Sequence, residues 1–201
     1  MKNSKNNLKK VFLMVALIAT VTGYANEDRF LISKNDVNGT VLTLTNVKVG
    51  NLFTIRGENG VIIYKESIQQ DGDFVKDFDL TDLPDGKYFF ELDKKVEISI
   101  IPFKVEGSQV TFNKELETTA FKPVTVVKDD MVYVTKLSLN KEPLDIEIYF
   151  ENSTSNGFNK IYSETVSNEK NIERLFKLAD INEGKYKIVY KSEGRMFVEF
   201  I

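Results

Sequence analysis

Apolar and polar side chains alternate with a period of two in short runs along most of the chain. The run 144–150 (LDIEIYF) is the clearest, and the runs 74–80, 96–100 and 185–191 follow the same rule. Alternation of this kind, interrupted by turn residues, is typical of β-strands with one buried face. Residues 169–179 differ in that their apolar positions also fit a helical period.

The sequence also repeats itself, without a gap, at a spacing of 98 residues, which places Gly86-Lys87-Tyr88 on Gly184-Lys185-Tyr186. Further matched pairs are Ile63-Tyr64 with Ile161-Tyr162, Glu66 with Glu164, Phe78 with Phe176, Leu80 with Leu178 and Asp82 with Asp180. A repeat that stays in phase with the apolar pattern indicates two copies of one structural unit. Since 74–80 alternates clearly, we expect a strand, not a helix, at 172–178.

Each copy holds seven or eight predicted strands. They are expected near 29–33, 41–46, 51–56, 61–68, 74–80, 87–92 and 96–103 in the first copy, and near 109–113, 121–127, 131–139, 144–150, 160–166, 172–178, 185–191 and 195–201 in the second. Turn signals about every 8–12 residues are typical of an immunoglobulin-like sandwich. We therefore predict an all-β protein of two tandem immunoglobulin-like β-sandwich domains, 26–104 and 105–201, with a short linker at 104–108.

The segment 80–88 (LTDLPDGKY) connects two predicted strands. Pro84 cannot donate to a strand ladder and therefore suits a connection. Tyr88 opens the next strand, where its ring can be buried while its hydroxyl returns to the backbone of the connection, as in the tyrosine corner of Greek-key sandwiches. Tyr186 takes this place in the second copy, with Asn182 instead of the proline. We expect the motif to define the fold rather than to bind a ligand.

Residues 1–25 have the parts of a secretory signal peptide. Four lysines precede an apolar run from Val11 to Val21, and the small residues Gly23 and Ala25 precede a cut at Asn26. The run has about half of the ~20 residues that a membrane-spanning helix needs, with an uncleaved anchor as the alternative. Cleavage removes four lysines and no acid, so the formal net charge moves from −3 to −7 and 176 of the 201 residues remain.

The composition excludes several kinds of chemistry. The chain has no His, Cys or Trp, which removes disulfides, zinc-thiolate sites, cysteine nucleophiles and the Ser-His-Asp triad. A formal net charge of −3 and a pI near 5.3 argue against a nucleic-acid partner. We predict no enzyme, no cofactor, and no catalytic, cofactor-binding or metal-ligating residue. The alternative is a hydrolase built on a pair of surface carboxylates.

Two features of the sequence are compatible with ligand binding, one with a metal ion and one with a sugar. The loop Asp71-Gly72-Asp73 offers the oxygen ligands that calcium prefers, but it lacks the spacing of an EF-hand, and the second copy has Glu169-Lys170-Asn171 in its place. We therefore expect solvated carboxylates there. Tyr149, Phe158 and Phe197 are out of phase with their neighbours or lie in a loop, and we expect them at the surface as inter-domain contacts or, alternatively, as a sugar platform.

The run 78–88 (FDLTDLPDGKY), followed by apolar strands, resembles the C-terminal sorting domains of type IX secretion cargo and related short, uncharacterised secreted bacterial proteins with an immunoglobulin-like module. Glu58-Asn59-Gly60, which leads through Val61–Ile63 into Tyr64, is similar to an asparagine-glycine hairpin of that family. The resemblance implies secretion, a β-sandwich and no catalysis. It also implies an alternative in which 105–201 is a sorting domain and 26–104 is its small exported cargo.

The sequence thus predicts a secreted, periplasmic or cell-surface protein without catalysis. Its role is binding or structural, through loops or edge strands, toward an unidentified protein or glycan outside the cytoplasm. We expect no nucleic-acid partner and no stable membrane span in the mature chain.

Overall fold

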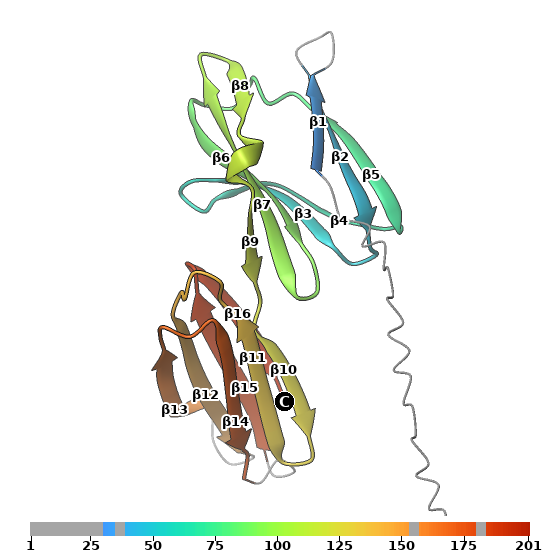
Figure 1. Cartoon of the computed structure of the whole chain (residues 1–201). Coiled ribbons are helices and arrows are strands. Elements are labelled where there is room, and N and C mark those ends of the chain that lie inside the picture. The colour runs from blue at the N-terminus through green and yellow to red at the C-terminus, as the bar shows by residue number, and fades with distance from the viewer. Residues whose placement is uncertain (1–29, 35–38, 153–156, 180–183) are drawn as a thin grey trace, which may run out of the picture.

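The computed structural model describes residues 30–34, 39–152, 157–179 and 184–201, and it consists almost entirely of antiparallel β-strands (Figure 1). The predicted signal peptide, 1–25, lies outside the described residues. In the described part, no helix is both long and apolar enough to span a membrane.

The first half of the chain forms two packed β-sheets, the larger of which is extended at one edge by two short strands. Its elements are β1 (Phe30–Lys34), β2 (Thr40–Val47), β3 (Leu52–Gly57), β4 (Ile62–Ser67), β5 (Gly72–Phe78), β6 (Gly86–Asp93), β7 (Glu97–Glu106), β8 (Gln109–Phe112), the 3-10 turn η1 (Lys114–Leu116) and β9 (Thr118–Phe121). One sheet has the order β1-β2-β5. The other has the order β4-β3-β6-β7-β8, with β9 also paired to β7.

The second half repeats this arrangement. Its strands are β10 (Val124–Lys128), β11 (Met131–Leu137), β12 (Leu144–Asn152), β13 (Asn159–Val166), β14 (Asn171–Lys177), β15 (Gly184–Ser192) and β16 (Arg195–Phe200). The sheets have the orders β10-β11-β14 and β13-β12-β15-β16. Because β10 to β16 follow the order of β1 to β7, the internal repeat is a repeat of topology. The expected strand at 172–178 is confirmed by β14.

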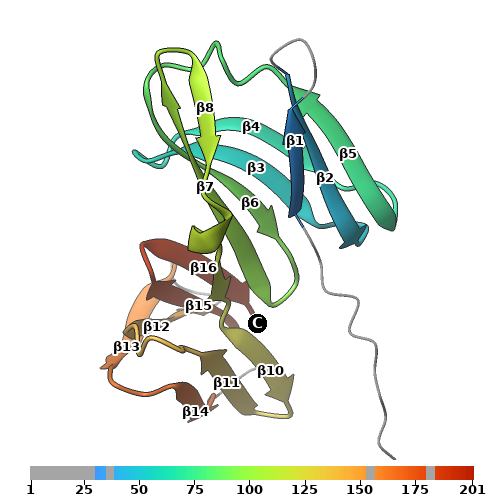
Figure 2. The same ribbon diagram turned by 45° about the horizontal axis from the view of Figure 1, so that its top comes forward.

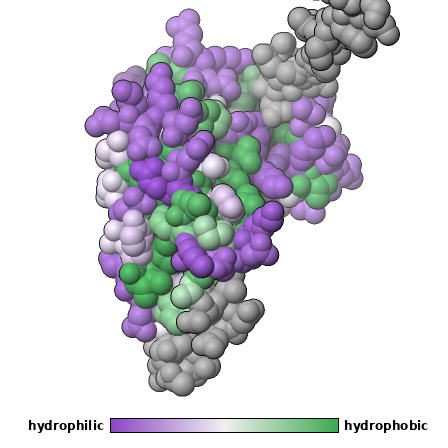
Figure 3. All heavy atoms as spheres, turned by 60° about the horizontal axis from the view of Figure 1, so that its bottom comes forward, coloured by the Kyte–Doolittle hydropathy of each residue, from purple (hydrophilic) through white to green (hydrophobic). Residues whose placement is uncertain are grey.

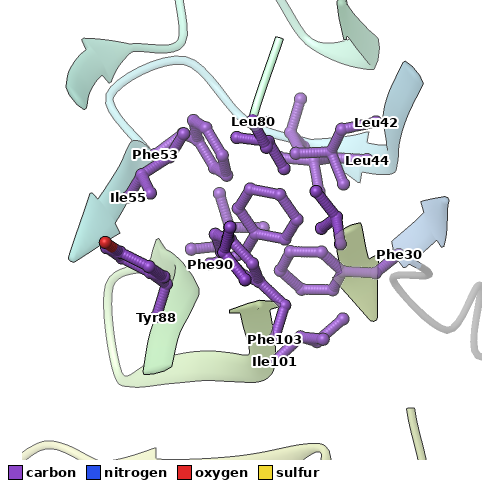
Figure 4. Packing of buried hydrophobic residues seen from close by; sticks show 14 of the residues in the cluster. Phe30, Leu42, Leu44, Phe53, Ile55, Leu80, Tyr88, Phe90, Ile101 and Phe103 are labelled. Atoms are coloured by element: carbon purple, nitrogen blue, oxygen red, sulfur yellow. The ribbon is translucent and has the colours of Figure 1, made fainter. Parts of the chain in front are cut away.

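The alternation of apolar and polar side chains along the strands explains the hydrophobic core of the first sandwich. Inward-facing residues of both sheets meet in one apolar cluster, in which Leu42 and Leu44 point toward Phe90 and Phe103 (Figure 4). The rings of Phe90 and Phe103 lie 4.6 Å apart between centroids, a distance typical of favourable aromatic pairs. The ring of Phe53 lies 5.7 Å from that of Phe90. The all-β sandwich prediction is therefore confirmed in this half.

A separate cluster fills the second sandwich, with Leu144, Ile146, Ile188 and Tyr190 fully buried. The Tyr190 hydroxyl lies 2.7 Å from Thr125 Oγ1, which joins β15 to β10 across the core. Burial raises the pKa of Tyr190 to about 12, so the phenol stays neutral.

Both tyrosine corners form as predicted. The Tyr88 hydroxyl donates to the carbonyl oxygen of Pro84 at 2.6 Å. The Tyr186 hydroxyl donates to the carbonyl oxygen of Ala179. Both rings are buried, so each hydroxyl ties a strand start to its incoming connection. Asn182, which replaces the proline in the second copy, lies outside the described residues.

The structure differs from the sequence prediction between residues 104 and 121. Gly107 and Ser108, expected in a linker, both have positive φ angles (55° and 61°) and form the two-residue turn of a hairpin between β7 and β8. Positive φ at both positions is the mark of the type I′ turn that suits twisted strands. The expected linker is thus a hairpin, and the strand expected at 109–113 of the second copy belongs to the first sandwich.

The units are accordingly named by their sheets: the N-terminal unit spans 30–121 and the C-terminal unit spans 124–201. Figures 1 and 2 show the two stacked end to end, with β9 leading from one toward the other. How the chain divides into independently folding domains stays a prediction.

Candidate binding surface

The connection between the units is short and fixed to the N-terminal unit. The backbone N–H of Lys122 donates to the carbonyl of Val96 at 2.9 Å. Its ammonium group donates to the carbonyl of Lys94 at 2.6 Å and forms an ion pair with Asp93. Pro123 follows, with its φ fixed by its ring. The chain therefore enters the C-terminal unit in a set direction.

A buried ion pair joins the two units at the same end. Arg195, at the start of β16, donates to both oxygens of Glu91 on β6, with N–O distances of 2.6 and 3.2 Å. The side chains are only 16% and 5% exposed, respectively. Arg56 on β3 adds a third contact, Nη2 to Glu91 Oε2 at 3.3 Å. A carboxylate removed from water in this way needs such partners.

The turn that carries Arg195 is held from its own unit as well. Lys136 on β11 has a buried side chain whose ammonium group lies 2.9 Å from Glu193 Oε1. A hollow of about 310 Å³ lies at the junction, between Val96 and Phe121 of the N-terminal unit and Thr135 and Ile172 of the other. A larger open hollow of about 670 Å³ borders the first tyrosine corner. Glu173 is the sole acid in the lining of the junction hollow, whereas Glu58 and Asp85 both line the larger one.

The outer face of the sheet β13-β12-β15-β16 carries a network around Glu147. Its Oε2 accepts from the Tyr149 hydroxyl at 2.9 Å and from the Lys191 ammonium at 3.2 Å, and its Oε1 accepts from the Lys160 ammonium at 3.4 Å. The hydrogen bond from Tyr149, followed by that from Lys191, lowers the pKa of Glu147. The same bond to Glu147 raises the pKa of Tyr149.

Aromatic rings continue this face beside the network. The ammonium group of Lys187 lies 4.5 Å from the ring centroid of Tyr149 and 4.8 Å from that of Phe158, both within the range of a cation–π contact. The ring of Phe158 is 6.0 Å from that of Phe200. Lys187 and Phe200 are directly opposite in the β15–β16 ladder, which brings the four side chains together.

The final strand adds exposed apolar surface. Met196, Val198 and Phe200 alternate along β16 and are 62%, 42% and 69% exposed. Figure 3 shows that apolar side chains also gather on the surface between polar areas, not only in the cores. We call Tyr149, Phe158, Lys187 and the three β16 side chains the β16 face. Large exposed apolar groups beside aromatic and charged ones are typical of interaction surfaces.

The three aromatic residues that the sequence analysis expects at the surface, Tyr149, Phe158 and Phe197, do not share one environment. Tyr149 and Phe158 lie together around Lys187 of their own unit. A role as inter-domain contacts or as a sugar platform stays a prediction. Phe197 was expected at the surface, but it packs against the second core, opposite the buried Tyr190. The exposed face of β16 is instead the wholly apolar one, with Met196, Val198 and Phe200. Lys187 was missed, since only the register places it opposite Tyr149.

The acidic loop has a structural role in the β2–β3 turn. Asp71 Oδ1 accepts from the backbone N–H of Val49 at 2.8 Å, and its Oδ2 lies 3.4 Å from the Lys48 ammonium. The backbone hydrogen bond is the main cause of the lowered pKa of Asp71. Among the described residues, no cluster of three or more acidic side chains is placed to hold a metal ion. That Asp71 and Asp73 are solvated rather than bound to calcium stays a prediction.

Comparisons with known proteins find only distant similarity. No family model matches the chain, and no curated protein matches it. Among solved structures, a two-domain fibronectin type-III segment from chicken tenascin is 12% identical, covers 87% of this chain and 97% of its own, and has a TM-score of 0.26. So low a TM-score carries no further argument. The strand orders themselves define two immunoglobulin-like β-sandwiches.

Proposed function

We propose that the protein is exported and non-enzymatic, and that it binds a protein or glycan outside the cytoplasm through the β16 face. The observation that carries the proposal is the exposed row of Met196, Val198 and Phe200 beside the Tyr149–Lys187–Phe158 contact. Immunoglobulin-like sandwiches occur in many cell-surface domains, which is compatible with a binding or structural role. The residue chemistry of this face, with rings, an ammonium group and apolar side chains, suits recognition and offers no activated nucleophile.

Export is tested on the protein recovered from fractionated cells. We expect it outside the cytoplasm, with an N-terminus at Asn26 by mass spectrometry. An intact N-terminus at Met1 in the cytoplasmic fraction would contradict the export part of the proposal.

Binding is tested with isolated cell envelopes and with glycans released from them. We compare the wild type with a Phe158→Ser, Phe200→Ser double variant. The matched control is Leu31→Ser, Val75→Ser, which removes two exposed apolar side chains from the N-terminal unit. Loss of binding by about 10-fold or more in the first variant alone supports the β16 face. Equal binding by all three proteins would assign recognition elsewhere.

The sorting-domain alternative makes a different prediction. If the C-terminal unit is a transport signal, removing residues 124–201 retains the remainder inside the cell. If the signal peptide alone directs export, the N-terminal unit still leaves the cytoplasm.

A further inference from the structure

The two units differ at one edge of their larger sheets. In the N-terminal unit, β7 pairs with β6 on one side, and its other side is covered by β8 along 103–106 and by β9 along 97–100. In the C-terminal unit the equivalent strand, β16, pairs with β15 and ends the strand order of the described sheet. The same position in the fold is therefore filled by strands in one unit, whereas in the other no strand of the described residues occupies it.

Side-chain exposure follows this difference. Ile98 and Ile100 of β7 correspond to Met196 and Val198 of β16 at the 98-residue spacing. Ile98 lies opposite Ala120 of β9 and is 4% exposed, whereas Met196 is 62% exposed. The N-terminal unit thus shows that this edge accepts an antiparallel strand.

Hydrogen bonding defines which groups of β16 face the open edge. Tyr186 and Ile201 exchange both backbone hydrogen bonds at 2.9 Å. Because such pairs alternate along an antiparallel ladder, Phe197 and Glu199 also direct their N–H and C=O groups toward β15. Met196, Val198 and Phe200 direct theirs away from β15. The three residues with exposed side chains are therefore also those with open backbone groups.

The strand has few of the features that protect sheet edges. Its sequence, RMFVEF, contains no lysine, proline or glycine, and its ladder with β15 has an unbroken register. The opposite edge strand, β13, carries Lys160, and its ladder has a register shift at Ile148/Tyr149. Bulges, lysines and prolines are the usual means of blocking edge-to-edge pairing.

We infer that β16 pairs antiparallel with β16 of a second copy of this chain, centred on Val198. In this register, Val198 lies opposite Val198 of the other copy and Met196 lies opposite Phe200. All three open residues then form hydrogen-bonded pairs, and the outer-face pairs are apolar. Glu199 faces Phe197, so no like charges lie directly opposite. The pairing joins two four-stranded sheets and places two β16 faces side by side; its argument does not depend on the proposed ligand.

Sedimentation velocity of the purified protein over a concentration series tests the pairing. We expect a reversible monomer–dimer equilibrium. Val198→Pro removes the N–H that points to the open edge and keeps the ladder with β15, so dimerisation should weaken about 10-fold or more. Val198→Thr is the control, because it keeps both the N–H and a β-branched side chain. A monomer throughout, or equal dimerisation of the two variants, would overturn the inference.

Single cysteines test the register, since the natural chain has none. Residues in a hydrogen-bonded pair have Cα atoms about 5.5 Å apart, within disulfide reach. Val198→Cys should therefore cross-link on mild oxidation. Met196→Cys and Phe200→Cys lie about 13 Å from their own counterparts and should cross-link only when mixed. Equal cross-linking of each variant with itself, or none at Val198→Cys, would refute the register.

Discussion

The ion pair between the units offers the most direct test of how firmly they are joined. Arg195→Met removes the guanidinium and keeps an apolar stem beside Glu91. Loss of one partner of a buried pair commonly costs about 3–5 kcal/mol. Here Arg56 stays 3.3 Å from the carboxylate, so Glu91 keeps a cation. The loss is then that of charge-assisted hydrogen bonds, and we expect a cost of about 2 kcal/mol.

A double-mutant cycle with a second substitution, at Glu91, measures the coupling between the two residues, and an exposed ion pair serves as the control. Glu91→Gln leaves Arg56 and Arg195 without their carboxylate and should cost more than Arg195→Met. The double variant should show a coupling energy of about 1–2 kcal/mol. Lys104→Met is the control, because the Lys104–Glu106 pair is exposed and should change stability by less than about 0.5 kcal/mol.

Differential scanning calorimetry measures the change in the unfolding midpoint of each variant. A loss of about 2 kcal/mol should lower the first unfolding midpoint by roughly 8–16 °C for a unit of this size. Urea denaturation of the wild type, the two single variants and the double variant gives the coupling free energy. If the Glu91→Gln and Arg195→Met effects simply add, and neither exceeds that of Lys104→Met, the pair does not join the units.

Two further predictions concern groups within single units. Tyr88→Phe removes the hydroxyl that donates to Pro84 and should lower the free energy of unfolding by about 1–2 kcal/mol in urea denaturation; a change below about 0.3 kcal/mol would contradict a role for this bond. The lowered pKa of Glu147 means that its stabilising effect is present above the carboxyl's unfolded pKa and is lost as the pH falls through the lower folded value. The stability difference between wild type and Glu147→Gln should therefore shrink from about pH 6 to about pH 3, and a constant difference would refute the assignment.

The sequence was sufficient for the strands whose two faces differ. In the run 144–150 one face is apolar and the other mostly polar, so the period alone determines the inward side. The tyrosine corners were likewise predictable, because a proline or turn signal precedes a tyrosine at a strand start. Residues 172–178 were ambiguous by themselves and were resolved by comparison with 74–80.

Features that depend on partner choice were not predictable. Nothing in the side chains of 109–112 states which sheet this strand joins, and a turn at Gly107-Ser108 looks like a linker until its φ angles are known. Phe197 was misplaced because the wholly apolar face of β16, with Met196, Val198 and Phe200, is the exposed one, so the alternation pointed to the wrong side. The contact of Lys187 with Tyr149 needs the ladder register, which one sequence does not provide.

The assignment of β8 and β9 to the first sandwich has a practical consequence for dividing the molecule into fragments. A fragment that stops at residue 104 would lose Val105 and Val110, both buried, and would leave β7 without β8 or β9. Ending it at Phe121 instead preserves every layer of that body. Residues that look like a linker in the sequence thus form the edge of the first sandwich, and the smallest intact fragment extends beyond residue 104, where the sequence places the end of the first domain.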